Sequence, residues 1–324
     1  METLAEFSLR RPASVAEATR LLATPGARAL AGGTDLVVNL RRGLEKPAIL
    51  VDLAGVPGLD ALTWSDAGCE IGACITLARL ARDARVRKEL PVLAQAAQSV
   101  AAPTHRSAAT LGGNLCVDTR CVYYNQSEGW RRSNGYCLKR GGEICHVAPR
   151  GKRCHAAFSG DVAPALLALE AKVELASSAG GRKIPLAELY QDDGAAHLAL
   201  APGEFILRVL VPRPALGVRT AYRKVRQRGS IDFPLAGVAV ALACAHGRLE
   251  ELRIALTGTN PRPLLLSGTE ELLGKQVDES LLARISKLVQ KQASPVRTTL
   301  VQANYRRQVA AVIAQRLVKE LSAL

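Results

Sequence analysis

The sequence predicts an α+β protein built from two or three domains. A chain of 324 residues is longer than a single domain with one hydrophobic core usually is. Strand-like and helix-like apolar patterns both occur along the chain, and the 48% apolar and 22% charged residues are typical of a soluble globular protein. One stretch, residues 118–156, has almost no hydrophobic periodicity and is rich in Arg, Gly, Asn and Tyr. A loop of that length inside a compact domain is usually functional.

Residues 1–55 are expected to form a small lobe with a βαβ-like order. Apolar residues at helical spacing follow Ser14, a favourable N-cap, and predict a helix over 14–23. Strands are expected at 27–31 and 48–53. Between them, the motif AGGTD at 31–35 separates two apolar runs. Glycines permit a close backbone approach, and consecutive N–H groups in such a turn can bind an anion. The motif lacks the G-x-G-x-x-G pattern, which disfavours a Rossmann-type cofactor site.

The middle of the chain, residues 56–217, is expected to form a second lobe that contains the aperiodic stretch. A strand is predicted at 70–73, helices at 77–86 and 92–100, regular structure again from 161–169, and alternating segments at 172–175 and 205–211. A second glycine motif, TLGGN, follows the helices at 110–114. Its Thr hydroxyl and Asn amide flank two glycines, a set suited to hydrogen-bonding a phosphate.

Residues 218–324 are expected to form a separate C-terminal α+β domain. Three strand-like runs come first, and two amphipathic helices follow them. The strands are predicted at 219–225, 236–244 and 249–257, and the helices at 278–291 and 299–322. The order of the elements predicts an antiparallel sheet with helices packed on it.

Four of the eight cysteines, Cys121, Cys137, Cys145 and Cys154, lie in the aperiodic stretch. Their spacing, C-x15-C-x7-C-x8-C, has no short knuckle of the kind that zinc sites use, which disfavours zinc without excluding it. A [4Fe-4S] cluster needs only four thiolates that converge in space. The pattern therefore leaves an iron-sulfur cluster, a zinc site or unrelated thiols open.

The other thiols and two histidines are expected to have ordinary roles. Cys116 is expected to be a packed thiol in the second glycine motif, and three cysteines in apolar contexts are expected in the core. Those three are Cys69, Cys74 and Cys244. His146 and His155 follow two of the four clustered cysteines and could be ligands of a zinc ion, but we expect polar neighbours of a cluster instead.

The charge pattern and the lack of a long apolar run exclude several classes of protein. The chain carries 43 basic and 29 acidic residues, a net charge of +14. No nucleic-acid motif accompanies this charge, so we expect acidic protein partners and no nucleic acid. Residues 119–155 contain eight basic and two acidic residues, a net charge of +6 that would favour an anionic thiolate cluster and attract an acidic donor. No secretory signal or membrane-spanning run is present, so we expect a cytoplasmic protein without membrane contact or disulfides.

The two glycine motifs, together with GDVAPAL at 160–166 and YRKV at 222–225, resemble the flavin subunits of the xanthine dehydrogenase and CO dehydrogenase class of molybdenum enzymes. The resemblance covers nearly the whole chain in the right order. It implies a two-lobed FAD-binding domain of the molybdenum-hydroxylase flavoprotein type, with an iron-sulfur insertion loop at 118–156, and a C-terminal α+β domain. Thr104 and His105 depart from the pattern of the family, where Gln and an aliphatic residue are usual.

The resemblance also implies the residues that contact FAD. Asp161 would act as an acceptor and Lys224 as a charge near the flavin or ribityl end. The full set is Leu30, Ala31, Gly32, Gly33, Thr34, Asp35, Leu36, Ala101, Thr104, Thr110, Gly112, Gly113, Asn114, Asp161, Ile206 and Lys224. No Ser-His-Asp arrangement, carboxylate pair or HExxH motif is present, so no catalytic residue is expected and the chemistry belongs to cofactors.

One branch of this family, the β subunits of 4-hydroxybenzoyl-CoA reductases, resembles the chain within the aperiodic stretch as well. The shared runs are PTHR at 103–106, YNQSE at 124–128 and NGYCLK at 134–139. The resemblance implies a [4Fe-4S] cluster held by Cys121, Cys137, Cys145 and Cys154, with ferredoxin as the electron donor. It implies a [2Fe-2S] small subunit and a molybdenum-cofactor large subunit as partners, in a dimer of heterotrimers that removes a phenolic hydroxyl in anaerobic aromatic degradation. The alternative is the FAD subunit of another molybdenum hydroxylase that works oxidatively on an aromatic or CoA-linked substrate, with zinc folding the cysteine loop for docking.

Overall fold

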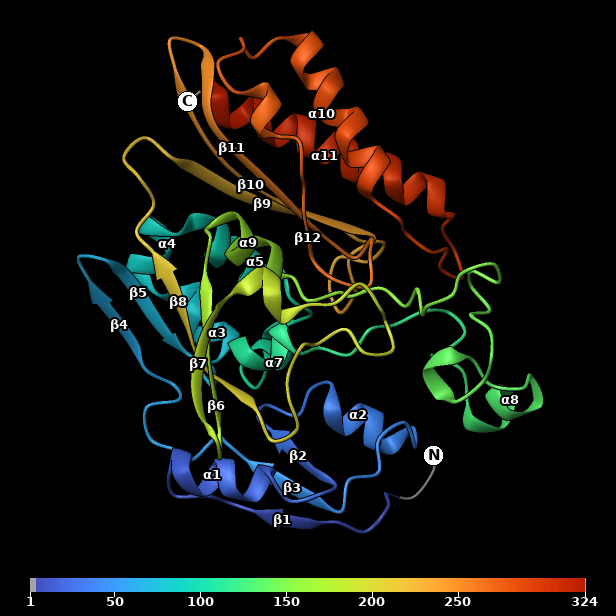
Figure 1. The fold of residues 1–324 in the computed structure, drawn as a ribbon. Coiled ribbons are helices and arrows are strands. Elements are labelled where there is room, and N and C mark those ends of the chain that lie inside the picture. Colours follow the sequence, from blue (N-terminus) through green and yellow to red (C-terminus); the bar gives the residue numbers. More distant parts are fainter. Residues whose placement is uncertain (1–3, 324) are drawn as a thin grey trace.

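The computed structural model describes residues 4–323, which form three sheets and the helices packed on them. In Figure 1 the N-terminal lobe (blue) lies at the bottom and the C-terminal sheet with its helices (orange to red) at the top. The second lobe lies between them, and the aperiodic stretch (green, around α8) projects to one side. The expected α+β architecture with an antiparallel C-terminal sheet is confirmed.

The first lobe is a parallel sheet of order β1-β3-β2 with two helices. Ser14 caps the first helix, because its hydroxyl accepts from the Glu17 N–H. The elements are β1 (Ser8–Arg10), α1 (Val15–Leu22), β2 (Ala27–Leu30), α2 (Leu36–Arg41) and β3 (Ile49–Asp52). The apolar run that follows the AGGTD motif is thus a helix, and its start fixes the position of that motif between β2 and α2.

The second lobe is an antiparallel five-stranded sheet of order β4-β5-β8-β6-β7, with helices covering its core. Its strands are β4 (Leu62–Ser65), β5 (Gly68–Gly72), β6 (Lys172–Ser177), β7 (Gly180–Pro185) and β8 (Phe205–Pro212). Its helices are α3 (Leu77–Arg82), α4 (Ala84–Glu89), α5 (Pro91–Ser99), α6 (Pro103–Arg106), α7 (Leu111–Leu115) and α9 (Val162–Ala168), with the short 3-10 helix η2 (Leu186–Leu189).

The helix expected over 77–86 is in fact two helices that meet at Asp83. This residue ends α3 with an extended backbone, φ −60° and ψ 125°. Its carboxylate then accepts from the N–H groups of Arg85 and Val86 and caps α4. The apolar periodicity continues through the break, so the pattern concealed it, whereas the capping preference of Asp accounts for it.

The aperiodic stretch, residues 118–156, which we call the insertion, contains only α8 (Glu128–Ser133) and the 3-10 helix η1 (Leu138–Arg140). A buried guanidinium orders part of it. Arg131 is fully buried and donates to the backbone oxygens of Tyr124 and Gln126 and to the Glu128 carboxylate. A charged donor with several acceptors can order a loop that has little apolar surface to bury.

The C-terminal unit packs its sheet between two layers of helices. Its elements are β9 (Arg219–Val225), β10 (Ala236–Ala245), β11 (Arg248–Thr257), β12 (Leu264–Leu265), η3 (Glu270–Leu272), α10 (Glu279–Gln292) and α11 (Ala303–Ser322). On β10, Val238, Val240 and Leu242 face the core formed with α10 and α11. The alternate residues Ala239 and Ala241 join the core of the second lobe, where α9 packs on β10 and β11. Small residues on that face bring the sheet close to the second lobe.

Among residues 4–323, no helix combines the length and the apolar character needed to cross a bilayer.

Candidate functional site

The two glycine motifs pack against each other, backbone on backbone. A Cβ on Gly32 would lie 1.9 Å from the carbonyl oxygen of Ala108, a contact that no side chain permits. Gly33 has φ +70°, in the region that favours glycine. Both glycines of the first motif are therefore required by the fold itself, besides any role toward a cofactor.

The backbone of the first motif offers donors that the protein does not use. Within residues 4–323, no acceptor is recorded for the N–H groups of residues 32–36, whereas the Val37 N–H donates to the Gly33 oxygen. A run of unpaired N–H groups in a turn forms a concave site for an anion such as a pyrophosphate. This part of the chain fits the phosphate-binding role that the sequence predicts.

The second motif is a short helix rather than a loop. Thr110 is the N-cap of α7, and its hydroxyl accepts from the Gly113 N–H at 3.1 Å. The Gly112 N–H donates to the Ala73 oxygen at 2.8 Å, and a Cβ on Gly112 would lie 2.9 Å from the Ala73 Cβ. Both glycine N–H groups thus have protein partners, and Gly112 is needed for the contact between α7 and the end of β5.

Asn114, Asp161 and Lys224 also have partners within the protein. The Asn114 Oδ1 accepts from the Val162 N–H at 3.1 Å and so fixes the start of α9. Asp161 forms a buried ion pair with Lys224, 2.9 Å between Oδ2 and Nζ, and accepts from the Tyr222 hydroxyl at 2.6 Å. Burial raises the pKa of Asp161, while the Lys224 ammonium and the Tyr222 hydroxyl oppose this rise. The contacts of Asp161 with Lys224 and Tyr222 hold β9 of the C-terminal sheet against the second lobe.

The remaining residues expected at FAD are spread over several elements. Ala101 has φ +39°, and its oxygen accepts from the Ile231 N–H at 3.1 Å. Thr104 is exposed on α6, Ile206 is buried in β8, and Leu30 ends β2 beside the first motif. The positive φ of Ala101 marks strained backbone next to the β9–β10 loop.

The four clustered cysteines line one pocket of the insertion. Cys137, Cys145 and Cys154 are buried, and Cys121 is half-buried. Other residues around the pocket are Tyr123, Tyr124, Leu138, Lys139, His146 and Val147. The structure thus brings together thiols that lie as far as 33 positions apart in the sequence. Cys116 lies outside the set of residues that line this pocket.

Two of the four sulfurs accept hydrogen bonds from the backbone around the pocket. Within residues 4–323, no three His, Cys, Asp or Glu side chains are arranged to hold a single metal ion. Zinc would bring all four sulfurs within about 2.3 Å of one point. Backbone N–H groups donate to two of the sulfurs, Tyr124 to Cys121 at 3.3 Å and Ala156 to Cys154 at 3.4 Å. Hydrogen bonds of this kind set the potential of iron-sulfur clusters.

Burial raises the pKa of the Cys121 thiol, and it raises the pKa of the Cys154 thiol to about 12, so these two thiols stay protonated when no metal is bound. A coordinating metal deprotonates thiols outright, so metal loading releases protons here.

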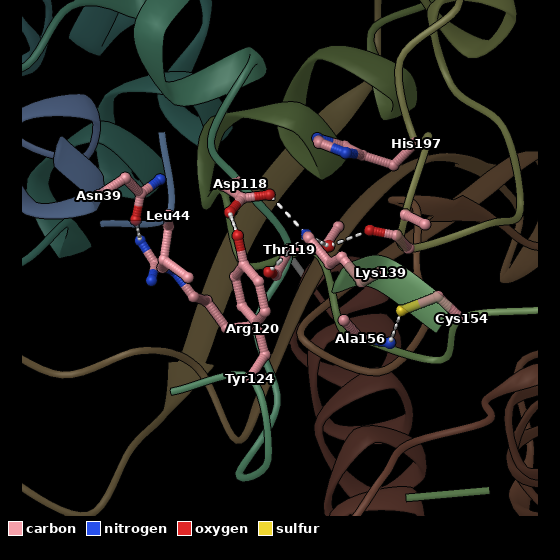
Figure 2. A network of polar contacts seen from close by, with 12 residues as sticks. Asn39, Leu44, Asp118, Thr119, Arg120, Tyr124, Lys139, Cys154, Ala156 and His197 are labelled. Atoms are coloured by element: carbon pink, nitrogen blue, oxygen red, sulfur yellow. Dashed lines mark hydrogen bonds and ion pairs between the residues drawn. The ribbon is translucent and has the colours of Figure 1, made fainter. Parts of the chain in front are cut away.

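A polar network joins the insertion to the first glycine motif and to Asn39 of α2, and Figure 2 shows the part around Asn39, Arg120, Asp118 and Lys139. Arg120 donates to the Asp35 Oδ1 at 2.7 Å and to the Asn39 side chain, and the Asp118 N–H donates to the Asp35 Oδ2 at 3.0 Å. Asp118 also binds the Lys139 ammonium at 2.6 Å. No sequence pattern indicates these contacts, because Arg120 and Lys139 resemble many other surface charges of the chain.

Arg120 keeps unused donors beside the first motif. Its side chain is 8% exposed, and its Nε and Nη1 have no hydrogen-bond partner within the described residues. A buried guanidinium with unpaired N–H groups is unfavourable unless an acceptor is supplied. An anionic cofactor next to residues 31–35 would supply one.

The histidines of the insertion pack against neighbouring residues, and two of the three thiols expected in the core are buried. His146 stacks on Tyr123 at 4.0 Å and donates from Nε2 to the Tyr136 oxygen at 2.6 Å. His155 lies against Gly151. Cys69 and Cys74 are buried in the cores of the lobes, as expected, and Cys244 is half-buried against the C-terminal core.

Two family models match the chain and together cover most of it. Residues 5–214 match the FAD-binding domain in molybdopterin dehydrogenase, and residues 220–321 match the C-terminal domain of the CO dehydrogenase flavoprotein. Among curated proteins, the FAD-binding subunit of an aldehyde oxidoreductase of Escherichia coli K12 is 36% identical over 261 residues, which are 78% of this chain and 80% of that protein. The carbon monoxide dehydrogenase medium chain of Afipia carboxidovorans is 27% identical over 98% of this chain and 97% of its own length.

Solved structures agree over the full length. A chain of reconstituted CO dehydrogenase from Oligotropha carboxidovorans superposes with a TM-score of 0.81 at 26% identity, covering 99% of each chain. A chain of quinoline 2-oxidoreductase from Pseudomonas putida 86 superposes with a TM-score of 0.79 at 27% identity, again covering 99% of each.

Proposed function

Since this chain belongs to the CO dehydrogenase and xanthine dehydrogenase flavoprotein family, as an FAD-binding medium subunit of a molybdenum hydroxylase, we propose that it carries a second redox group, a [4Fe-4S] cluster in the insertion. The cluster would be the entry point for electrons and FAD the next carrier. The observation that carries this proposal is the pocket lined by Cys121, Cys137, Cys145 and Cys154 in an insertion tied to the first glycine motif.

The first glycine motif and Arg120 are the parts of the chain best suited to hold the FAD pyrophosphate. The motif offers five backbone donors at residues 32–36, and Arg120 adds a positive charge with unused N–H groups. We propose that Asp161 and Lys224 act as a fixed ion pair beside the flavin, because their carboxylate and ammonium already satisfy each other. FAD would accept and donate electrons singly or in pairs.

Three features of the insertion support the cluster. Four thiols, the number of ligands that a [4Fe-4S] cluster uses, line one pocket. Two of the sulfurs accept backbone hydrogen bonds. The stretch 119–155 has a net charge of +6, which offsets the negative charge of a cluster with four thiolates and attracts an acidic donor.

We propose that the donor is ferredoxin and that the chain works in a 4-hydroxybenzoyl-CoA reductase. Electrons would leave FAD for the [2Fe-2S] clusters of a small subunit and reach a molybdenum cofactor on a large subunit, where the phenolic hydroxyl of the substrate is removed reductively. The assembly would be a dimer of heterotrimers, as the resemblance within the insertion implies. The substrate would not contact this subunit.

An oxidative molybdenum hydroxylase is the second candidate, because it needs the same FAD domain. The family relatives include enzymes named for aldehyde, CO and quinoline chemistry, and the fold does not distinguish their reactions. The insertion is what favours the reductive reaction, since an extra one-electron centre is useful where a ferredoxin is the donor.

Two measurements on the purified protein test the proposal. The chain should show flavin absorption bands and a broad shoulder near about 400 nm that bleaches on reduction, with about four irons per chain. Flavin bands with stoichiometric zinc and no iron would contradict the cluster. The native complex, isolated with its co-eluting subunits, should convert 4-hydroxybenzoyl-CoA to benzoyl-CoA with reduced ferredoxin; oxidation of an aromatic substrate without this activity would support the second candidate.

A further inference from the structure

Lys139 differs from the other basic residues of the insertion because its charge is inside the protein. Its side chain is 7% exposed and lines the same pocket as the four thiols. Lys152, by contrast, lies on the surface of the same insertion, where water and salt screen its charge.

Three partners fix the ammonium at this place. The Nζ donates to the Asp118 Oδ1 at 2.6 Å and to the backbone oxygen and hydroxyl of Thr119. It also lies 4.5 Å from the centre of the Tyr124 ring, and the Tyr124 hydroxyl donates to the other oxygen of Asp118 at 3.0 Å. A lysine with three hydrogen-bond acceptors and an aromatic face has little freedom to move.

The ion pair has a definite direction relative to the thiols. Lys139 lines the pocket, whereas Asp118, whose carboxylate binds the Lys139 ammonium and the Tyr124 hydroxyl, does not. Of the two members of the ion pair, the cation is therefore the one that borders the thiols. In surroundings of low dielectric constant, a fixed dipole of this kind acts on a nearby charge more strongly than a surface residue does.

We propose that Lys139 is a positioning residue for electron entry, whose buried charge raises the reduction potential of the group held by the four thiols. This inference rests on the proposed [4Fe-4S] cluster. One electron from an external reductant enters the cluster and adds one negative charge; no bond forms or breaks, and no proton needs to move. A nearby cation stabilises the reduced form, and Asp118 weakens this effect by its opposite charge.

The test is a redox titration of the purified full-length protein with dithionite, followed by the electron paramagnetic resonance signal of the reduced cluster. The variants are Lys139→Met, Asp118→Asn and, as a matched control, Lys152→Met. We expect Lys139→Met to make reduction about tenfold less favourable, which is about 59 mV toward lower potential for one electron. Asp118→Asn should shift the potential in the opposite direction, and Lys152→Met should leave it unchanged.

Opposite shifts in the two buried variants support the inference, because a purely structural role would not give shifts of opposite sign. Potentials equal to the parent, or shifts in the same direction, overturn it. If Lys139→Met loses its iron, Asp118→Asn decides alone, with a raised potential in support and an unchanged one against. A parent protein without iron contradicts the proposed function itself, which separates the two failures.

Discussion

The carboxylate of Asp35 accepts a hydrogen bond from the guanidinium of Arg120, with 2.7 Å between Oδ1 and Nη2. Asp35 belongs to the first glycine motif, and Arg120 directly precedes Cys121, the first of the four pocket thiols. The other oxygen of Asp35 accepts from the Asp118 N–H. One side chain thus ties the proposed phosphate-binding turn to the start of the insertion, and the two sites share a fixed geometry.

Removing the Asp35 carboxylate should loosen this connection. In Asp35→Ala the buried guanidinium of Arg120 loses its counter-charge, and we expect a loss of about 2–4 kcal/mol in the free energy of unfolding. Trypsin should then cleave within 119–155 faster than in the parent. The control is Glu320→Ala, which removes the exposed partner of Arg223 and should change stability by less than about 1 kcal/mol. Equal trypsin sensitivity of Asp35→Ala and the parent would contradict the anchoring role.

The glycines of both motifs should be required for FAD. Gly32→Ala forces a Cβ against the Ala108 oxygen, and Gly33→Val places a branched side chain at φ +70°. Gly112→Val would clash with Ala73. We expect each variant to be purified with little or no FAD, measured as flavin absorbance per chain.

The control for these variants is Gly55→Ala. A Cβ on Gly55 would meet no atom within 4 Å, so this protein should keep its flavin. Full flavin content in both Gly33→Val and Gly112→Val would show that the cofactor does not depend on the two motifs.

A single pocket thiol should be essential for iron but not for flavin. Cys137→Ser removes one of four proposed ligands, and we expect it to lose about four irons per chain while FAD stays bound. Cys244→Ser, a half-buried thiol of the C-terminal unit, should keep its iron. Iron content in Cys137→Ser equal to that of the parent would rule out the proposed ligand set.

The elements of the fold that could be predicted are those with a strong local pattern. The serine-capped helix α1 and the long strands β10 and β11 follow directly from spacing and capping. The short exposed strand β1 was missed because three exposed residues leave no alternation to detect. The start of α11 at Ala303 rather than 299 follows a turn in which the Thr298 hydroxyl and backbone bind Val301.

Residue types in the sequence predict which segments belong to the site, but they do not predict which side chains contact each other. Cysteines and glycines are typical of metal and phosphate sites, so the sequence singles out the two motifs and the four thiols as candidates. The ion pairs of Arg120 with Asp35 and of Lys224 with Asp161 join residues far apart in the chain, and charge alone does not reveal partners. The second glycine motif is a short helix capped by Thr110, and a Thr-x-x-Gly cap is hard to tell from a turn by sequence alone.

A buried histidine should make the folded protein sensitive to mild acid. His197 is 7% exposed, its Nε2 donates to the Val117 oxygen at 3.0 Å, and burial lowers its pKa to about 4. In the unfolded chain a histidine has a pKa of about 6.5. Between these two values the unfolded state binds a proton that the folded state does not, so stability is lost as the pH falls from about 6.5 to 4 and changes little above 7. The loss from this residue approaches about 3 kcal/mol.

His197→Gln should flatten the fall in melting temperature between pH 7 and pH 5, whereas His246→Gln, at an exposed position, should leave the profile of the parent. Parallel profiles for His197→Gln and the parent would show that other groups govern the acid sensitivity.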